Sequence, residues 1–161
     1  MEQQAYKISS VRAIENLIAQ YTHFLDAGDF AGVAGLFKYG KIISTGIVAD
    51  GSENIEKHLK ENLQMYGNGT PNTAHITTNT VLKISDDDHS ATASSYMSIF
   101  QQDLDRGFPL QPIIIGRYND SFARIDGAWY FKERNLVISL LGDYTHHANP
   151  AAQSSKNLRS E

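Results

Sequence analysis

The stretch GRYNDSFARIDGAW at residues 116–129 decides the fold. Its Asp-Gly dipeptide at 126–127 is a strong signal for a two-residue hairpin turn. The residues on either side of the dipeptide alternate between apolar and polar, as they do in a strand with one buried face. The sequence therefore predicts an antiparallel pair of strands over residues 111–125 and 128–141.

Counting outward from this turn gives the register of the pair. Phe122 lies opposite Phe131, and Tyr118 lies opposite Asn135 on the same face, which also carries Trp129. We expect helices to cover this face. The other face is mostly polar and should meet solvent or a partner; its pairs are Ala123 with Tyr130, Ser121 with Lys132, and Asn119 with Arg134.

The rest of the chain divides into a helical part and a strand-like part. Before residue 70 apolar residues recur at steps of three and four, and after it they alternate. The predicted helices cover residues 8–27, 30–37 and 50–66, a short strand pair covers 41–49, and two more long strands cover 72–84 and 89–104. Helices followed by an antiparallel meander predict an α+β domain with helices on one face of a curved sheet.

The length of 161 residues suggests one domain, with its core at about residues 8–141. Residues 143–161 have no periodicity and few large apolar side chains, so we interpret them as a mobile polar tail. The adjacent His146 and His147 in this tail are interpreted as solvated rather than as a metal site. We expect no metal and no cofactor.

The overall composition excludes several classes of function. The formal net charge is −4 and no basic tract occurs, so nucleic-acid binding is not expected. No apolar run approaches the roughly 18 residues that cross a bilayer, and no signal peptide is recognisable. The absence of Cys excludes disulfides and thiol catalysis. We therefore expect a soluble, cytoplasmic protein that does not interact with membranes.

The end of the first predicted helix, YTHFLDAGDF at residues 21–30, carries a carboxylate inside an apolar run. Ser9 or Ser10 is the expected N-cap of this helix, and Gly28 its C-terminal stop. A buried carboxylate is unfavourable unless it is paired or used. Asp26 is therefore either a structural hydrogen-bond acceptor or part of a catalytic site.

Three motifs together resemble the SnoaL-like branch of the NTF2-like superfamily over about residues 8–141. They are Y-x-x-x-L-D-x-G-D in the first helix, A-H-I-T-T-N at the start of the first long strand, and G-R-Y-x-D-x-F-x-R-x-D-G-x-W at the hairpin. The resemblance implies a cone in which a bent sheet wraps around three helices and leaves a deep apolar pocket. The superfamily includes dehydratases, a dehydrochlorinase, isomerases, polyketide cyclases, small subunits of ring-hydroxylating dioxygenases, and non-catalytic members. Fold alone therefore does not fix the function.

The resemblance also implies catalytic positions. The dehydratase and dehydrochlorinase members have an Asp near the end of the first helix and a His at the start of the first long strand, which Asp26 and His75 match. Tyr21 matches a further tyrosine of the bile-acid dehydratase. The sequence departs from these enzymes on the next strand, where SSYMSIF at residues 94–100 contains neither an acid nor a His.

An Asp–His pair is suited to removing a proton from carbon, because the carboxylate fixes the tautomer and stabilises the imidazolium. Tyr21 would then donate to a leaving hydroxyl or a carbonyl oxygen. Each residue also has a structural interpretation: His75 as a satisfied histidine and Tyr21 as helix core. The candidate substrate-binding residues are Phe24, Phe37, Tyr96, Tyr118, Phe122 and Trp129.

The alternation around His75 leaves its surroundings open. His75 shares a strand face with Thr77, whereas Ile76, Leu82 and Ile84 take the other face. Either His75 points into a partly polar pocket, or a bulge shifts the pattern. If Ile76, Leu82 and Ile84 all point outward, they form an apolar row that invites a partner. We expect a homodimer, with a homotrimer as the alternative.

Two functions of different classes follow. The first is a cofactor-independent lyase or isomerase, dehydratase- or cyclase-like, that acts by Asp–His proton abstraction on a small apolar and cyclic molecule. The alternative is a non-catalytic ligand-binding or assembly module, or the small subunit of a ring-hydroxylating dioxygenase. Contact between Asp26 and His75 at a pocket favours the enzyme.

Overall fold

A computed structural model describes residues 2–150, with side chains from residue 9 onward. These residues form helices α1 (Glu2–Asp26), α2 (Phe30–Leu36) and α3 (Ser52–Asn62), a short 3₁₀ helix η1 (Leu104–Arg106), and strands β1 (Lys41–Ser44), β2 (Ile47–Asp50), β3 (Thr73–Ile84), β4 (Ser90–Asp103), β5 (Phe108–Ile125) and β6 (Ala128–Leu141). Within this part of the chain, no helix combines the length and the apolar character that crossing a membrane requires.

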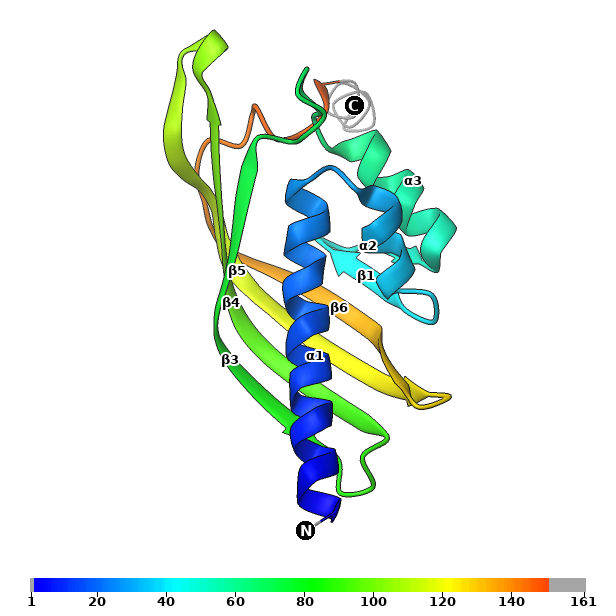
Figure 1. Ribbon diagram of the computed structural model, residues 1–161. Helices are drawn as coiled ribbons and strands as arrows, with labels where there is room; N and C mark the ends of the chain where they lie inside the picture. The colour runs from blue at the N-terminus through cyan, green and yellow to red at the C-terminus, as the bar shows by residue number, and fades with distance from the viewer. Residues whose placement is uncertain (1, 151–161) are drawn as a thin grey trace.

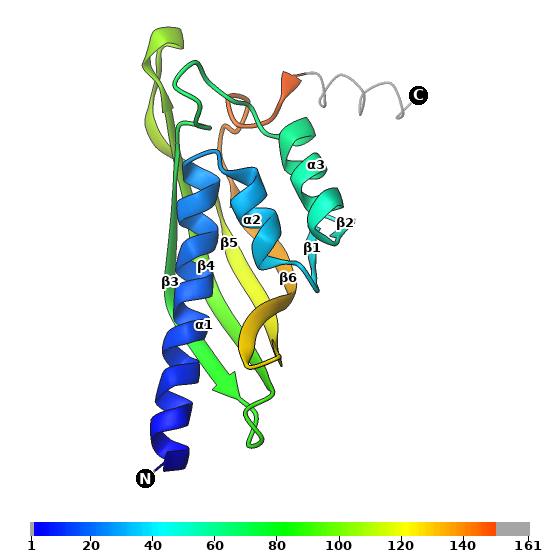
Figure 2. The same cartoon turned by 45° about the vertical axis from the view of Figure 1, so that its right-hand side comes forward.

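The strands form one bent sheet in the order β2-β1-β6-β5-β4-β3. All neighbouring strands are antiparallel except β1 and β6, which are parallel. Helix α1 runs along the inner face of the long strands, and α2 and α3 lie beside it toward β1 (Figures 1 and 2). Asp126 and Gly127 form the β5–β6 turn, with φ angles of 50° and 81° that a primed hairpin turn requires. The α+β prediction is confirmed.

The predicted β5–β6 register is correct near the turn and wrong beyond it. Phe122 pairs with Phe131 as expected, but the register shifts immediately after this pair. Tyr118 consequently lies opposite Leu136 instead of Asn135. The extra residue on β6 is a β-bulge, which alternation alone does not reveal. Phe122, Phe131, Tyr118 and Trp129 all face the helices, and each is at most 7% exposed.

The bulge turns Arg134 from the outer face to the interior, opposite Asp120 on β5. The two side chains are fully buried, and Arg134 Nε and Nη2 donate to the Asp120 carboxylate at 2.8 and 2.7 Å. The guanidinium carbon also lies 4.1 Å from the ring centre of Tyr21 and 4.0 Å from that of Tyr118. Burial opposes the charge on Arg134, but Asp120 outweighs it and raises the pKa of the guanidinium above its usual value.

A second β-bulge lies on β3, and it makes the predicted outward row of Ile76, Leu82 and Ile84 wrong. The register with β4 shifts between Thr78 and Val81, and Asn79 takes a φ of 53°. Past this point Leu82 and Ile84 turn inward and pack against the core, together with His75 on the same face. Ile76 and Val81 remain outside, 45% and 60% exposed.

Both ends of the predicted core extend further than expected. Helix α1 begins at Glu2, so neither Ser9 nor Ser10 is its N-cap; Ser10 lies inside the helix and its Oγ donates to Asp88 Oδ2 at 2.9 Å. Residues 143–150 are not a free tail, because Leu63 and Ala148 form a β-bridge. Residues 151–161 of the expected tail lie outside the described residues.

The buried ion pair generates a stability prediction. Asp120→Asn leaves the Arg134 cation buried without its counterion, and breaking such a pair destabilises a fold by about 3–5 kcal/mol. We expect a loss of this order in the free energy of urea-induced unfolding. Asp120→Leu combined with Arg134→Met removes both charges and should lose much less. Equal losses in the single and double variants would contradict this account.

Candidate active site

The end of α1 fixes the position of Asp26. Gly28 has a φ of 74°, and its N–H donates to the Leu25 carbonyl at 3.0 Å. The next N–H, of Asp29, donates to the Phe24 carbonyl at 2.8 Å. These two bonds form a Schellman motif, in which glycine adopts the left-handed conformation without strain. Asp26 is therefore the last helical residue, held rigidly next to the start of β3.

Three donors from β3 converge on the Asp26 carboxylate. Thr73 Oγ1 donates to Oδ1 at 2.8 Å, and the His75 backbone N–H donates to Oδ2 at 2.8 Å. The His75 ring nitrogen Nδ1 lies 2.5 Å from Oδ1. Burial disfavours the ionised carboxylate, but the hydrogen bonds and charge interaction with His75 outweigh it and lower the pKa of Asp26. An ionised Asp26 only accepts, so neutral His75 carries its proton on Nδ1 and leaves Nε2 as a base.

His75 lines a cavity of about 260 Å³ between the sheet and helices α1 and α3. Much of its wall is aliphatic, and its members include Leu25, Ile55, Ile99, Ile114, Leu136 and Ile138. No Asp, Glu, Lys or Arg side chain is among the described residues that line it. The His75 side chain is only 4% exposed, whereas that of Asp26 is 25% exposed. A base of this kind in a mostly apolar cavity is shielded from water.

Two predicted tyrosines belong to the cavity wall. Tyr21 and Tyr118 both line it, and their rings pack edge to face with centres 5.8 Å apart. Burial raises the pKa of Tyr21, and nearby Arg134 opposes this shift only in part. Burial, together with Tyr21, raises the pKa of Tyr118 well above its usual value. Both phenols are therefore uncharged at neutral pH and available as hydrogen-bond donors.

The other five candidate substrate-binding residues do not line this cavity. Phe37 and Phe122 are buried in the core and contact Phe131 at ring-centre distances of 4.6 and 4.7 Å. Trp129 is buried near the hairpin turn. Tyr96 is 44% exposed, and its hydroxyl accepts a hydrogen bond from Arg117. Their expected place in the pocket wall is corrected accordingly.

The fifth of these residues, Phe24, lies on the α2 side of α1. A Cβ atom built on Gly32 of α2 would come within 2.9 Å of the Phe24 ring. Phe24 therefore packs between the two helices instead of lining the cavity.

His147 is a cavity residue that the sequence interpretation missed. It is 8% exposed, lines the cavity, and its ring centre lies 6.4 Å from that of His75. Burial lowers the pKa of His147 to about 4, and neighbouring His75 adds to this effect. The histidine pair at 146–147 was the available signal, but the polar surroundings led to its interpretation as solvated.

A SnoaL-like domain model matches residues 7–135, which is most of the chain. The chain belongs to the SnoaL-like family. No curated protein matches the sequence. The interpretation based on the three sequence motifs is thus confirmed at the level of the family.

Solved structures share the fold of this SnoaL-like protein. A provisionally assigned scytalone dehydratase from Novosphingobium aromaticivorans DSM 12444 is 25% identical, with a TM-score of 0.71 over 91% of this chain and 96% of that chain. An NTF2-like protein with a cystatin-like fold from Novosphingobium aromaticivorans is 18% identical, with a TM-score of 0.71 over 94% and 91%. LinA is 18% identical, with a TM-score of 0.70 over 89% and 95%.

The depressed pKa of His147 generates a prediction about stability and pH. An unfolded histidine takes up a proton near pH 6.5, whereas folded His147 does so only near pH 4. The contribution of neutral His147 to the free energy of unfolding is therefore complete above pH 6.5, falls as the pH falls, and is lost by about pH 4. The total loss is at most about 3 kcal/mol. We expect the free energy of urea-induced unfolding to fall less between pH 7 and pH 4.5 for His147→Leu than for the wild type. Equal drops would contradict the assignment.

Proposed function

We propose that this SnoaL-like protein is a cofactor-independent lyase or isomerase in which His75 removes a proton from carbon. The observation that carries the proposal is the contact between Asp26 and His75 in the wall of a mostly apolar cavity. A non-catalytic binding module has no use for a carboxylate that fixes the tautomer of a cavity histidine. The same contact favours the enzyme over the small subunit of a dioxygenase.

The proposed chemistry begins at His75 Nε2. This nitrogen takes a proton from a carbon next to an electron-withdrawing group, and the electron pair of the broken C–H bond passes into the substrate. Asp26 stabilises the imidazolium that forms, because its carboxylate is ionised and already bonded to Nδ1. The Tyr21 hydroxyl donates to the oxygen on which charge develops, or to a departing hydroxyl. His75 then returns its proton to the product or to the leaving group.

The cavity wall supports an uncharged substrate. A charged molecule would lose its hydration at a surface whose described lining contains no Asp, Glu, Lys or Arg side chain in compensation. The aliphatic wall instead favours a small apolar molecule, and the raised pKa values of the cavity tyrosines leave them as neutral donors. The substrate class that fits these properties is a small, uncharged, cyclic compound with an acidic C–H bond.

The proposal is tested by isotope exchange into a carbon acid. The probe is 2-tetralone, an uncharged bicyclic ketone whose α-protons exchange with D₂O, and NMR measures the exchange rate. We expect the protein to accelerate exchange and His75→Ala to remove nearly all of the acceleration. Asp26→Asn should lower it about 10²–10⁴-fold through the loss of orientation and charge. Tyr21→Phe should lower it less, because only one hydrogen bond is deleted.

The matched control is His23→Ala, which removes an exposed histidine of α1. This variant should exchange the probe at the wild-type rate. A wild-type rate in His75→Ala, or no acceleration by the wild-type protein, would contradict the proposal.

We also propose that the protein is a homodimer, with a homotrimer as the alternative, assembled through the outer face of the sheet. Ile76 and Val81 are exposed on β3, and Val137 is exposed on β6 at 43%. Burial of such side chains favours association. Sedimentation at micromolar concentration should show a dimer or trimer, and Val81→Lys should shift it toward monomer. A monomeric wild type would contradict this proposal.

A further inference from the structure

His147 carries a buried ring nitrogen, Nδ1, that the described residues leave without a hydrogen-bond partner. A buried polar atom without a partner is destabilising by about 1–3 kcal/mol, so most such atoms in folded proteins are satisfied. His147 nevertheless lines the same cavity as His75. An oxygen of a bound molecule would supply the missing hydrogen bond.

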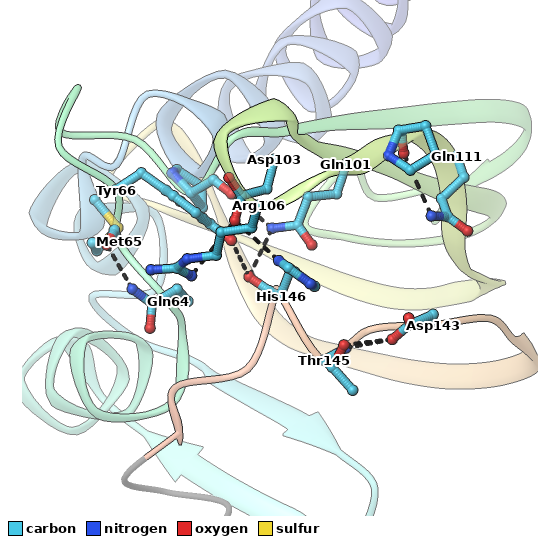
Figure 3. Close-up of polar contacts among 12 residues, drawn as sticks. Gln64, Met65, Tyr66, Gln101, Asp103, Arg106, Gln111, Asp143, Thr145 and His146 are labelled. Carbon is cyan, nitrogen blue, oxygen red and sulfur yellow. Dashed lines mark hydrogen bonds and ion pairs between the residues drawn. The ribbon is translucent and has the colours of Figure 1, made fainter.

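His146, the residue before His147, is anchored by contacts from distant parts of the chain (Figure 3). Tyr66 Oη and Gln101 Nε2 both donate to the His146 carbonyl, at 2.6 and 3.1 Å. The His146 ring stacks on Phe108 with centres 4.3 Å apart, and its Nδ1 lies 3.0 Å from Asp103 Oδ2. These contacts come from distant segments of the chain and converge on one residue.

The backbone on the other side of His147 is fixed as well. The Gln64 N–H donates to the His147 carbonyl at 2.8 Å, and the Asn149 N–H donates to the Asn62 carbonyl at 2.8 Å. The backbone of His147 is thus fixed on both sides, which sets the position from which its imidazole reaches the cavity. A rigidly held polar group is what recognition of a ligand requires.

We propose that His147 binds a hydroxyl or carbonyl oxygen of the substrate, next to the carbon from which His75 removes a proton. This inference rests on the proposed function and narrows its substrate class to uncharged ring compounds that carry such an oxygen. The 6.4 Å between the two ring centres leaves room for only a few substrate atoms that contact both. The oxygen and the acidic carbon therefore lie within a few bonds of each other.

The chemistry of the wall agrees with this assignment. His147 is uncharged at neutral pH, since burial lowers its pKa to about 4. A neutral imidazole both donates and accepts hydrogen bonds, so it accommodates either a hydroxyl or a carbonyl oxygen. The buried hydroxyl of Tyr118, which also lines the cavity, has no hydrogen-bond partner within residues 9–150. His147 and Tyr118 are therefore neutral hydrogen-bonding groups, and the described lining contains no Asp, Glu, Lys or Arg side chain to pair with an amine or a carboxylate.

The experiment compares the binding of three matched probes: indane, 1-indanol and 1-indanone. The last two add one oxygen to the same bicyclic frame, and NMR titration at pH 7.5 gives each Kd. The measured quantity is the Kd of indane divided by that of each oxygenated probe, which cancels differences in apolar burial. We expect His147→Leu to lower this ratio about fivefold to tenfold, as the loss of one buried hydrogen bond predicts. Indane itself should bind His147→Leu at least as tightly as the wild type.

Two further variants separate recognition from structure. His147→Asn retains a polar atom near the position of Nδ1 and should keep part of the preference for the oxygenated probes. His23→Leu removes an exposed imidazole and should leave every Kd unchanged. An unchanged ratio in His147→Leu, an equal weakening of all three probes, or no saturable binding to the wild type would overturn the inference.

The binding test of His147 is independent of the exchange test of His75 as the base. Probe binding requires no proton transfer, whereas exchange into 2-tetralone does. A lowered ratio in His147→Leu without isotope exchange in the wild type would support His147 as a ligand contact and reject His75 as the base. Isotope exchange in the wild type, combined with an unchanged Kd ratio in His147→Leu, would support His75 as the base and reject His147 as a ligand contact.

Discussion

The Asp26 carboxylate joins the two halves of this protein, and the site depends on that junction. It ends the helix that packs along the sheet, and it accepts three hydrogen bonds from Thr73 and His75 at the beginning of the first long strand. A carboxylate in this position would be unfavourable without partners. The bonds that satisfy Asp26 also orient the His75 ring, so the same contacts serve the fold and the proposed catalytic arrangement.

Asp120 is a fully buried carboxylate, and the contrast with the partly exposed Asp26 explains their roles. Asp120 forms a bidentate pair with Arg134, and both side chains are fully buried. They lie behind the wall tyrosines Tyr21 and Tyr118, and neither member of the pair lines the cavity. Asp26 is paired instead with a histidine that lines the cavity. A guanidinium cannot release its proton at any pH that the fold tolerates, whereas an imidazole exchanges protons near neutrality. The first pair therefore has a structural role, whereas the second is suited to acid–base chemistry.

Local signals in the sequence predicted the strands, helices and hairpin turn, and the resemblance of its motifs predicted the pairing of Asp26 with His75. The inward position of Arg134 and the inward turn of Leu82 were missed, because both follow from β-bulges that are decided by packing across the sheet. The inward Asp120, between Tyr118 and Phe122, was a usable sign that a buried cation had to lie nearby. His147 was missed because its segment is fixed by distant residues such as Tyr66 and Gln101, which periodicity does not detect.

The most direct test of the account is the tautomer of His75, measured by ¹⁵N NMR on histidine-labelled protein at a pH where this ring is neutral. The account predicts that Nδ1 carries the proton and that Nε2 is unprotonated, since Asp26 can only accept at Nδ1. Asp26→Leu, which offers no acceptor, should shift the ring toward a mixture of tautomers. A wild-type His75 with its proton on Nε2, or the same tautomer in both proteins, would contradict the claim that Asp26 prepares His75 as a base.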